Sequence, residues 1–224
     1  MAADTAVLAI GENAFPFHRF EEIGPHLADA LESPRIDVTL TTDRDDLTDL
    51  REYDVLLDYL TDSTLTEAQR SSVTGFVEGG GGYLGLHCAA DLTSTVSEHP
   101  DTVIESRDEP VPELRELIGG HFLTHPERST YDVRVVDSHH PITASLSDLR
   151  VYDEPYVLEV DDSVRVLARM DHYEHADMPV VWVRDHGDGR VCYVAVGHTV
   201  STITDPAVGD LLRRGVRWCT GDGH

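Results

Sequence analysis

Three features of the sequence predict an α/β fold with a mostly parallel central sheet. Short apolar segments alternate with longer amphipathic ones through the first 90 residues, which is the pattern of strands joined by helical crossovers. The segment 79–91, GGGGYLGLHCAAD, combines a glycine-rich helix end, a short buried strand and a sharp turn. After residue 130, strand-like segments follow one another closely and predict extra antiparallel strands in the C-terminal half.

The first half of the chain is expected to hold three strands and two helices before this turn. The second helix can begin at Thr64 or Thr66, because a hydroxyl accepts a hydrogen bond from a free N–H of the first helical turn. It ends at the glycines, and the buried strand 83–86 follows. The expected strands are 5–10, 35–41 and 54–60, and the first helix runs from about 19 to 31.

The second half is expected to hold five strands and a final helix. Gly187-Asp188-Gly189 is a turn signal and predicts a hairpin between the last two strands. Asp205-Pro206 opens the final helix. With no linker and no repeat, the chain is expected to form one domain over 1–224. The expected strands are 131–136, 152–160, 164–170, 180–184 and 190–196.

The composition is strongly acidic and excludes several classes of partner. The chain has 42 acidic residues against 17 basic ones, for a formal net charge of −25, and every basic residue is arginine. Nucleic acids and anionic membranes both require basic patches, so neither is an expected partner. A surface this negative is tolerated where salt screens it, which predicts a halophilic cytoplasm. No apolar segment is long enough to cross a membrane, and the N-terminus lacks the features of a signal peptide.

The turn after the buried strand marks the expected site. Small residues at Gly85, Ala89 and Ala90 allow a sharp strand-to-helix turn that lifts one side chain clear of the sheet. The residue at this place is His87, where many α/β enzymes have a nucleophile. The three cysteines are too few and too scattered for a disulfide framework or a four-thiolate zinc site.

Several further histidines lie where predicted elements end. In an open α/β sheet the loops after the strands meet at one edge, so His18 and His87 are expected to come together. His198 follows the last strand and Glu154 lies beside Pro155; both can join them. Of the adjacent carboxylates Asp153 and Glu154, Glu154 is favoured as the inward one. His125 and Tyr156 complete the candidate set.

Imidazole and carboxylate groups together suit two kinds of chemistry. They bind zinc or a similar divalent ion, for which His18, His87 and His198 are the candidate ligands, or they act as general acid and base near neutral pH. His121 and His125 have the H-x-x-x-H spacing of a helical metal site. Gly119-Gly120 before them and Pro126 after them instead favour a loop.

At these residues the chain resembles the ThuA-like family, named for a trehalose-utilisation protein. The resemblance spans about residues 5–218 and rests on seven motifs in order. They are FPFH at 15–18, GGGYLGLH at 80–87, GGHFLTHP at 119–126, HPIT at 140–143, DEPY at 153–156, GDGRV at 187–191 and GH at 197–198.

The resemblance implies a flavodoxin-like three-layer sandwich of the class I glutamine amidotransferase-like superfamily. In that superfamily the turn carries a nucleophilic cysteine in a Gly-x-Cys-x-Gly setting, whereas the matching residues here are Gly85-Leu86-His87-Cys88-Ala89. Imidazole does not replace a thiolate that forms a thioester, so glutamine hydrolysis is not expected. A shift of one residue would place Cys88 in the nucleophile position and allow thiol hydrolase chemistry.

The resemblance also implies a role in carbohydrate utilisation. We expect a protein that acts on a disaccharide such as trehalose, or on a keto derivative of one. His87, Glu154 and His198 are expected to be catalytic, with His18, His125 and Tyr156 contacting the substrate. The alternative is a non-catalytic sugar-binding or regulatory protein on an amidotransferase-like scaffold. No nucleotide cofactor is expected, and a homodimer would be ordinary for a protein of this size.

Overall fold

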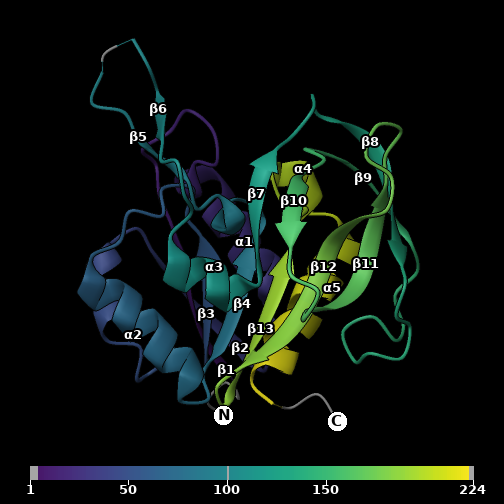
Figure 1. The fold of residues 1–224 in the computed structure, drawn as a ribbon. Helices are drawn as coiled ribbons and strands as arrows, with labels where there is room; N and C mark the ends of the chain where they lie inside the picture. Colours follow the sequence, from purple (N-terminus) through teal and green to yellow (C-terminus); the bar gives the residue numbers. More distant parts are fainter. Residues whose placement is uncertain (1–4, 100, 222–224) are drawn as a thin grey trace.

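A nine-stranded mixed sheet forms the centre of the molecule in the computed structural model, which describes residues 5–99 and 101–221 (Figure 1). The strand order is β2-β1-β3-β4-β13-β12-β11-β8-β9. The parallel part comprises β1 (Thr5–Gly11), β2 (Ile36–Thr41), β3 (Val55–Tyr59), β4 (Gly82–Leu86) and β13 (Gly189–Val194). The antiparallel part comprises β12 (Met178–His186), β11 (Arg165–Asp171), β8 (Ser129–Val135) and β9 (Leu149–Asp153).

The helices pack in two pairs. Helix α1 (Phe20–Leu31) packs against α5 (Pro206–Cys219), and α2 (Glu67–Glu78) packs against α3 (Pro112–Ile118). Short helical turns are η1 (Arg44–Thr48), η2 (His87–Ala90) and α4 (Val200–Ile203). The predicted α/β class, with a parallel first part and antiparallel later strands, is confirmed. The flavodoxin-like three-layer arrangement stays a prediction.

The ends of the chain limit two of these expectations. The predicted domain covers residues 1–224, so its first and last residues lie outside the described residues. The first four residues, in which no signal peptide is expected, also lie outside them. Within residues 5–99 and 101–221, no helix has both the length and the apolar character needed to span a membrane.

Local sequence explains where α2 begins and where β4 follows it. Thr66 Oγ1 accepts a hydrogen bond from the Gln69 N–H, and the Gln69 side chain accepts one from the Thr66 N–H, so Thr66 rather than Thr64 caps the helix. Gly80 has φ +107°, which reverses the chain after the helix. A Cβ at Gly82 would lie 2.7 Å from Cys219 Cβ, so glycine permits close packing of α5 on β4.

Two predictions about the second half are corrected. The expected strand 152–160 is broken at 154–156, because β9 belongs to the main sheet whereas β10 (Val157–Val160) pairs elsewhere. The expected loop 119–126 is wrong over most of its length, since β7 (Gly120–Thr124) is a strand that pairs antiparallel with β10. Gly120 fits this pairing because a Cβ there would lie 2.9 Å from the Glu159 carbonyl oxygen.

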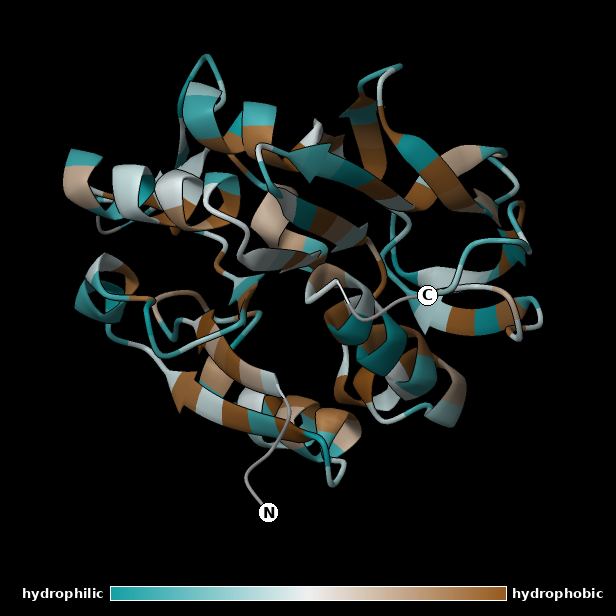
Figure 2. Ribbon diagram, turned by 90° about the horizontal axis from the view of Figure 1, so that it is seen from below, coloured by the Kyte–Doolittle hydropathy of each residue, from teal (hydrophilic) through white to brown (hydrophobic). Residues whose placement is uncertain are grey.

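Two small ribbons complete the fold. The β7–β10 ribbon packs against η2, which directly follows β4, and so brings the 154–156 segment to the end of the parallel strands. The other ribbon, β5 (Ser94–Val96) with β6 (Ile104–Ser106), projects from the body (Figure 1). The sheet strands carry much of the apolar core, and the hydrophilic colours gather in the turns and on outward helix faces (Figure 2).

Candidate functional site

Four side chains from four regions of the chain converge at the edge where the parallel strands end. His18 follows β1, His87 follows β4, and His198 follows β13; Glu154 follows β9. One nitrogen or carboxylate oxygen from each lies within 4.8 Å of those of the others. The expected meeting of His18 and His87 therefore occurs, with ring centroids 4.9 Å apart. We call these four residues the histidine cluster.

His87 is held by its backbone and by one ring nitrogen. The side chain is fully buried, and the backbone has φ +47°, a conformation that residues other than glycine rarely adopt. Nδ1 donates to the carbonyl oxygen of Ala195 at 2.7 Å. Because a carbonyl only accepts, Nε2 of the neutral ring carries the lone pair. This buried Nε2 makes no hydrogen bond among the described residues and lies 3.4 Å from Glu154 Oε2.

His18 repeats this arrangement on the neighbouring loop. It has φ +53°, so two of the cluster's histidines store backbone strain of the kind that gathers at functional sites. Its Nδ1 lies 2.9 Å from Thr61 Oγ1, and its Nε2 lies 2.8 Å from His198 Nδ1. Thr61 thus orients the ring from the end of β3.

Asp153 positions the other half of the cluster. Its carboxylate is fully buried and accepts hydrogen bonds from the backbone N–H groups of Glu154, Gly197 and His198, at 2.8, 2.8 and 3.1 Å. Of the two adjacent carboxylates, Asp153 therefore fastens the loops together while Glu154 faces the histidines. Glu154 Oε2 lies 3.0 Å from His198 Nδ1.

Three buried tyrosines add fixed points around the cluster. The Tyr193 hydroxyl donates to the His87 carbonyl oxygen at 2.8 Å, and the Tyr131 hydroxyl donates to that of Glu154 at 3.2 Å. The Tyr59 hydroxyl donates to the Gly197 carbonyl oxygen at 2.9 Å. These bonds satisfy buried carbonyls and fix the backbone that carries the site.

The electrostatics favour a charged Glu154 carboxylate beside a neutral His18. Burial alone would raise the pKa of Glu154, but the close contact with His198 and the nearby His87 ring outweigh it and hold the pKa well below its usual range. Burial, with the neighbouring His87 and His198, lowers the pKa of His18 well below its usual range. His18 is therefore neutral at pH 7 and able to offer a nitrogen lone pair.

The cluster could hold a divalent metal ion. Zinc bound tetrahedrally at about 2.0–2.1 Å places its ligand atoms about 3.3 Å apart. Three of the six distances between donor atoms here are 2.8, 3.0 and 3.4 Å, and all six are within 4.8 Å. The hydrogen bonds from His87 to Ala195 and between His18 and Thr61 resemble the outer contacts that orient metal-binding histidines. Imidazole and carboxylate ligands suit zinc and several other divalent transition metals.

A cavity of about 310 Å³ lies beside the cluster. His18 and His198 line it, together with Phe17 and the exposed Arg128. Its volume is at the lower end of the range for small-molecule sites. An aromatic face and a guanidinium next to two imidazoles provide stacking and hydrogen-bond donors for a polar ligand.

The other predicted site residues differ in their placement. His125 borders the cluster, with Nε2 3.8 Å from Glu154 Oε2 and Nδ1 donating to the Pro126 carbonyl oxygen at 2.8 Å. Tyr156 is buried and stacks on His87, with ring centroids 4.1 Å apart. His121 points elsewhere, because its Nδ1 accepts from Arg115 Nε at 2.9 Å. The catalytic and substrate-contact roles assigned from the sequence stay predictions.

Cys88 is poorly suited to be a nucleophile. The thiol is fully buried and donates to the Tyr59 carbonyl oxygen, with 3.3 Å between sulfur and oxygen. Burial raises the pKa of Cys88 well above its usual range, so little thiolate forms near neutral pH. This geometry argues against thiol hydrolase chemistry through Cys88.

Sequence reasoning missed the residues that orient the cluster. Thr61 could have been found, because it follows a parallel strand and so lies at the same edge as His18 and His87. Ala195 accepts a hydrogen bond through its backbone carbonyl, and the three tyrosines donate to backbone carbonyls. No sequence pattern indicates such contacts. Arg128 lies after β7 and was not distinguished from the other arginines.

Comparison with solved structures identifies proteins of similar fold. A putative ThuA-like protein from Bacteroides uniformis ATCC 8492 is 22% identical, with a TM-score of 0.74 over 97% of this chain and 92% of its own. A second, from Parabacteroides merdae ATCC 43184, is 18% identical, with a TM-score of 0.69 over 98% and 90%. The cold-adapted β-galactosidase of Rahnella sp. R3 is 19% identical, with a TM-score of 0.67 over 96% of this chain and 31% of its own. At these identities the likeness establishes the fold.

The sequence comparisons are more specific. No curated protein matches the chain. The sequence profile of the ThuA family, described as trehalose utilisation, matches residues 6–219, which is nearly the whole chain and includes every residue of the histidine cluster. The protein therefore belongs to the ThuA family.

Proposed function

We propose that this protein is a carbohydrate-processing enzyme of ThuA type that uses a divalent metal, zinc by preference, held by His18, His87, Glu154 and His198. The substrate class is a disaccharide such as trehalose or, in preference, its oxidised keto derivative. The reaction class is proton transfer at a carbon next to a carbonyl. The observation that carries the proposal is the buried Nε2 of His87, which faces a carboxylate and two further imidazole nitrogens without a hydrogen bond of its own.

The cost of this arrangement supports a ligand. An unpartnered polar atom in the interior costs about 1–3 kcal/mol. Two histidines with positive φ add about 1–3 kcal/mol each. A metal bound by the Nε2 lone pair would offset the cost of the unpartnered nitrogen. A ligand geometry that must stay fixed explains why the strained backbone of the two histidines is kept.

The residues around the cluster have distinct proposed roles. When bound, a divalent ion would polarise a carbonyl oxygen of the substrate and acidify the neighbouring carbon. His125 is the nearest imidazole outside the ligand set, and its Nε2 carries the lone pair because Nδ1 donates to Pro126. We assign to it the transfer of the proton from that carbon. Phe17 and Arg128 would bind and orient the sugar in the adjacent cavity.

Acid–base chemistry without a metal is less well supported. Glu154 would have to accept the proton, but its lowered pKa makes it a weak base. His87 is fully buried and stacks against Tyr156, which keeps its ring away from a substrate. A metal site would use both Glu154 and His87 as ligands in the positions that they already occupy.

The test is elemental analysis joined to an activity assay. Protein purified without chelator should contain about one metal ion per chain, and His87→Ala should reduce this to below about a tenth, because removing one ligand weakens a site far more than tenfold. Turnover of a keto-disaccharide should be lost in parallel. His121→Ala is the control, because His121 is another buried histidine and its ring pairs with Arg115 outside the cluster. Metal content and turnover that are both indifferent to His87 would overturn the proposal.

A second candidate is a sugar-binding or regulatory protein without catalysis. The observation in its favour is that the turn offers no accessible nucleophile, since His87 and Cys88 are both fully buried. Thermal-shift measurements with sugars separate the two functions. A sugar that raises the unfolding temperature but is recovered unchanged from a metal-loaded sample favours the regulatory function. A halophilic cytoplasm and a homodimer remain predictions beside either function.

A further inference from the structure

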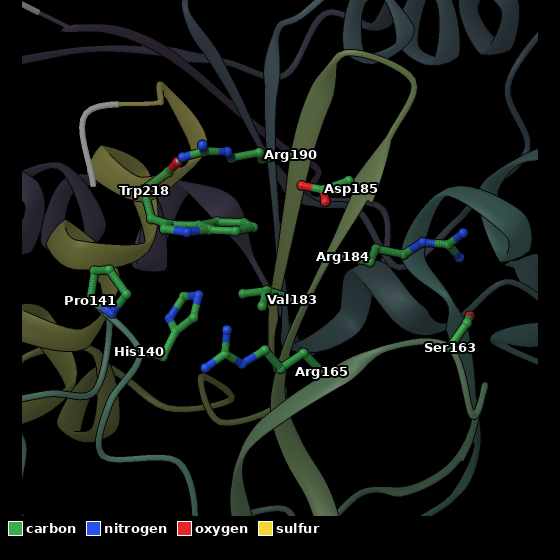
Figure 3. Close-up of a pocket in the computed structure, with 9 residues that line it drawn as sticks. All are labelled: His140, Pro141, Ser163, Arg165, Val183, Arg184, Asp185, Arg190 and Trp218. Atoms are coloured by element: carbon green, nitrogen blue, oxygen red, sulfur yellow. Dashed lines mark hydrogen bonds between the residues drawn. The ribbon is translucent and has the colours of Figure 1, made fainter. Parts of the chain in front are cut away.

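A second cavity, of about 600 Å³, lies at the opposite end of the sheet. Figure 3 shows His140, Arg165, Arg190 and Trp218 gathered around Val183, while the Arg184 side chain extends away from them. These residues come from β11, β12, β13, α5 and the turn after β8. We call this the arginine cavity.

The arginine cavity is separate from the histidine cluster. Arg190 is the second residue of β13, where it pairs with Gly82 at the start of β4, whereas His87 and His198 follow the ends of these strands. His198 lies eight positions after Arg190, which at a strand rise of about 3.3 Å per residue is a separation on the order of 25 Å along the chain. A ligand in one cavity therefore does not touch the residues of the other.

The arginine cavity gathers positive charge in a strongly negative protein. Arg165 is paired with Asp137 at 2.7 Å, and Arg184 donates to the Glu116 carbonyl oxygen, with Asp161 at 3.9 Å. Arg190 differs, because it makes no ion pair with a carboxylate within residues 5–99 and 101–221. Asp185 lies opposite it in the hairpin register without forming an ion pair. A cation left uncompensated in a chain with a net charge of −25 indicates an anionic partner.

Arg190 is also fixed in place. Its guanidinium carbon lies 5.1 Å from the centroid of the Trp218 ring, and Nη1 donates to the Trp218 carbonyl oxygen at 3.1 Å. A guanidinium has five N–H donors in a planar fork, so most of them remain for a ligand. Because the side chain is already ordered, binding loses less entropy than it would at a mobile arginine.

His140 supplies a second donor. The side chain is buried, and Nδ1 accepts the Ile142 N–H at 3.3 Å, which leaves the proton of the neutral ring on Nε2. Nε2 has no hydrogen-bond partner in the part of the chain that the structure describes. Its ring centroid lies 5.2 Å from that of Trp218. Burial and the nearby Arg165 lower the pKa of His140, so near neutral pH it is an uncharged donor.

We propose that the arginine cavity binds a small phosphorylated sugar, with its phosphate between Arg190 and His140. A guanidinium fork is well matched to phosphate oxygens. The cavity volume lies within the range of small-molecule sites and leaves room for a sugar ring beside the phosphate. Bound ligand would lie against the edge of Trp218. This inference is independent of the function proposed for the histidine cluster.

Tryptophan fluorescence of the full chain tests the proposal. The two tryptophans differ, because Trp182 is fully buried in the core and Trp218 borders the arginine cavity. Glucose 6-phosphate should change the emission saturably, inorganic phosphate should bind at least about threefold more weakly, and glucose should have no effect. The emission change should disappear in Trp218→Phe. Equal binding of glucose and glucose 6-phosphate, or no saturable change with either phosphate, would overturn the proposal.

Variants separate a specific contact from general charge. Arg190→Gln should weaken glucose 6-phosphate binding at least about tenfold, the effect of losing one hydrogen bond to a charged group. Arg217→Gln removes the same charge from an exposed position next to Trp218 and should change binding less than about twofold. Should Arg190→Gln not fold, Arg165→Gln takes its place, with a weaker loss expected. Equal weakening by Arg217→Gln and the cavity variants, or any weakening by His87→Ala, would contradict the assignment.

Discussion

His87 and Ala195 are joined by a 2.7 Å hydrogen bond from Nδ1 to a backbone carbonyl oxygen, and this contact determines what His87 can do. The carbonyl has no proton to donate, so a neutral imidazole here carries its proton on Nδ1. The lone pair of Nε2 then faces Glu154. Ala195 follows β13, in the segment that continues to His198. One backbone contact therefore links two members of the histidine cluster.

Replacing His87 with asparagine separates this anchoring contact from the lone pair. The amide of asparagine can still donate toward Ala195, but no nitrogen reaches the position of Nε2. We expect His87→Asn to fold with a loss of up to about 3 kcal/mol and to hold less than about a tenth of the metal, measured by urea unfolding and elemental analysis. Full metal occupancy in His87→Asn would remove His87 from the ligand set.

Asp153 should be as important to the cluster as its members, although it does not face them. Asparagine at this position turns an N–H group toward the backbone N–H groups of Gly197 and His198. We expect Asp153→Asn to lower the free energy of unfolding by about 1–3 kcal/mol and to reduce metal content severalfold. Asp171→Asn, at an exposed position, is the control for charge. If Asp153→Asn is destabilised but keeps its metal content, the hydrogen bonds to the Asp153 carboxylate serve the stability of the fold alone.

Two buried tyrosines distinguish support of the site from support of the fold. Tyr193 donates to the His87 carbonyl oxygen, and Tyr83 donates to Asp58 Oδ2 at 2.7 Å. Each substitution to phenylalanine should cost about 1 kcal/mol of unfolding free energy. Only Tyr193→Phe should also lower metal affinity or turnover. Equal effects on the site from both variants would show that general loosening, and not the contact with His87, is responsible.

Asp58 should give stability a distinct pH dependence. Burial raises the pKa of Asp58 from 3.8 to about 6. A raised folded-state pKa stabilises the fold fully below the unfolded value of 3.8, and this stabilisation is lost as the pH rises through about 6. Asp58→Asn should therefore match the wild type near pH 4 and exceed it above pH 6, by at most about 3 kcal/mol.

Urea unfolding between pH 4 and 8 measures this difference. Asparagine can keep both contacts of Asp58, accepting from the Leu60 N–H and meeting the Tyr83 hydroxyl. Asp37→Asn, at an exposed position, controls for removal of one negative charge. A difference between Asp58→Asn and the wild type that stays constant across this range would contradict the shifted pKa.

The net charge predicts that salt stabilises the fold. Raising KCl from 0.01 to 1 M shortens the screening length from about 30 to about 3 Å, so repulsion among the 42 acidic residues declines. The thermal unfolding midpoint should rise steeply over this interval and more slowly above it. A midpoint that is flat from 0.01 to 1 M would contradict the expectation of a halophilic cytoplasm.

The sequence predicted the main sheet well because its signals are local. The apolar segments that became β1, β3 and β4, the glycines after α2 and the Gly187-Asp188-Gly189 turn each act within a few residues. It failed at 119–126, where two glycines and a proline favour a loop. There the pairing of β7 with β10 supplies backbone hydrogen bonds from a segment more than 30 residues away, and local propensity does not record them.

By itself, then, the sequence determined the fold class, the family and the residue types of the histidine cluster, including the preference for Glu154 over Asp153. The loops that follow parallel strands meet at one edge of the sheet, and this was enough to predict that His18 and His87 lie close together. Only the tertiary structure decided which nitrogen of His87 is free, that Thr61 and Ala195 orient the rings, and that Arg190 lies beside Trp218 in a second cavity. These depend on backbone carbonyls and on distances of a few ångströms between distant segments, which residue identity and spacing do not encode.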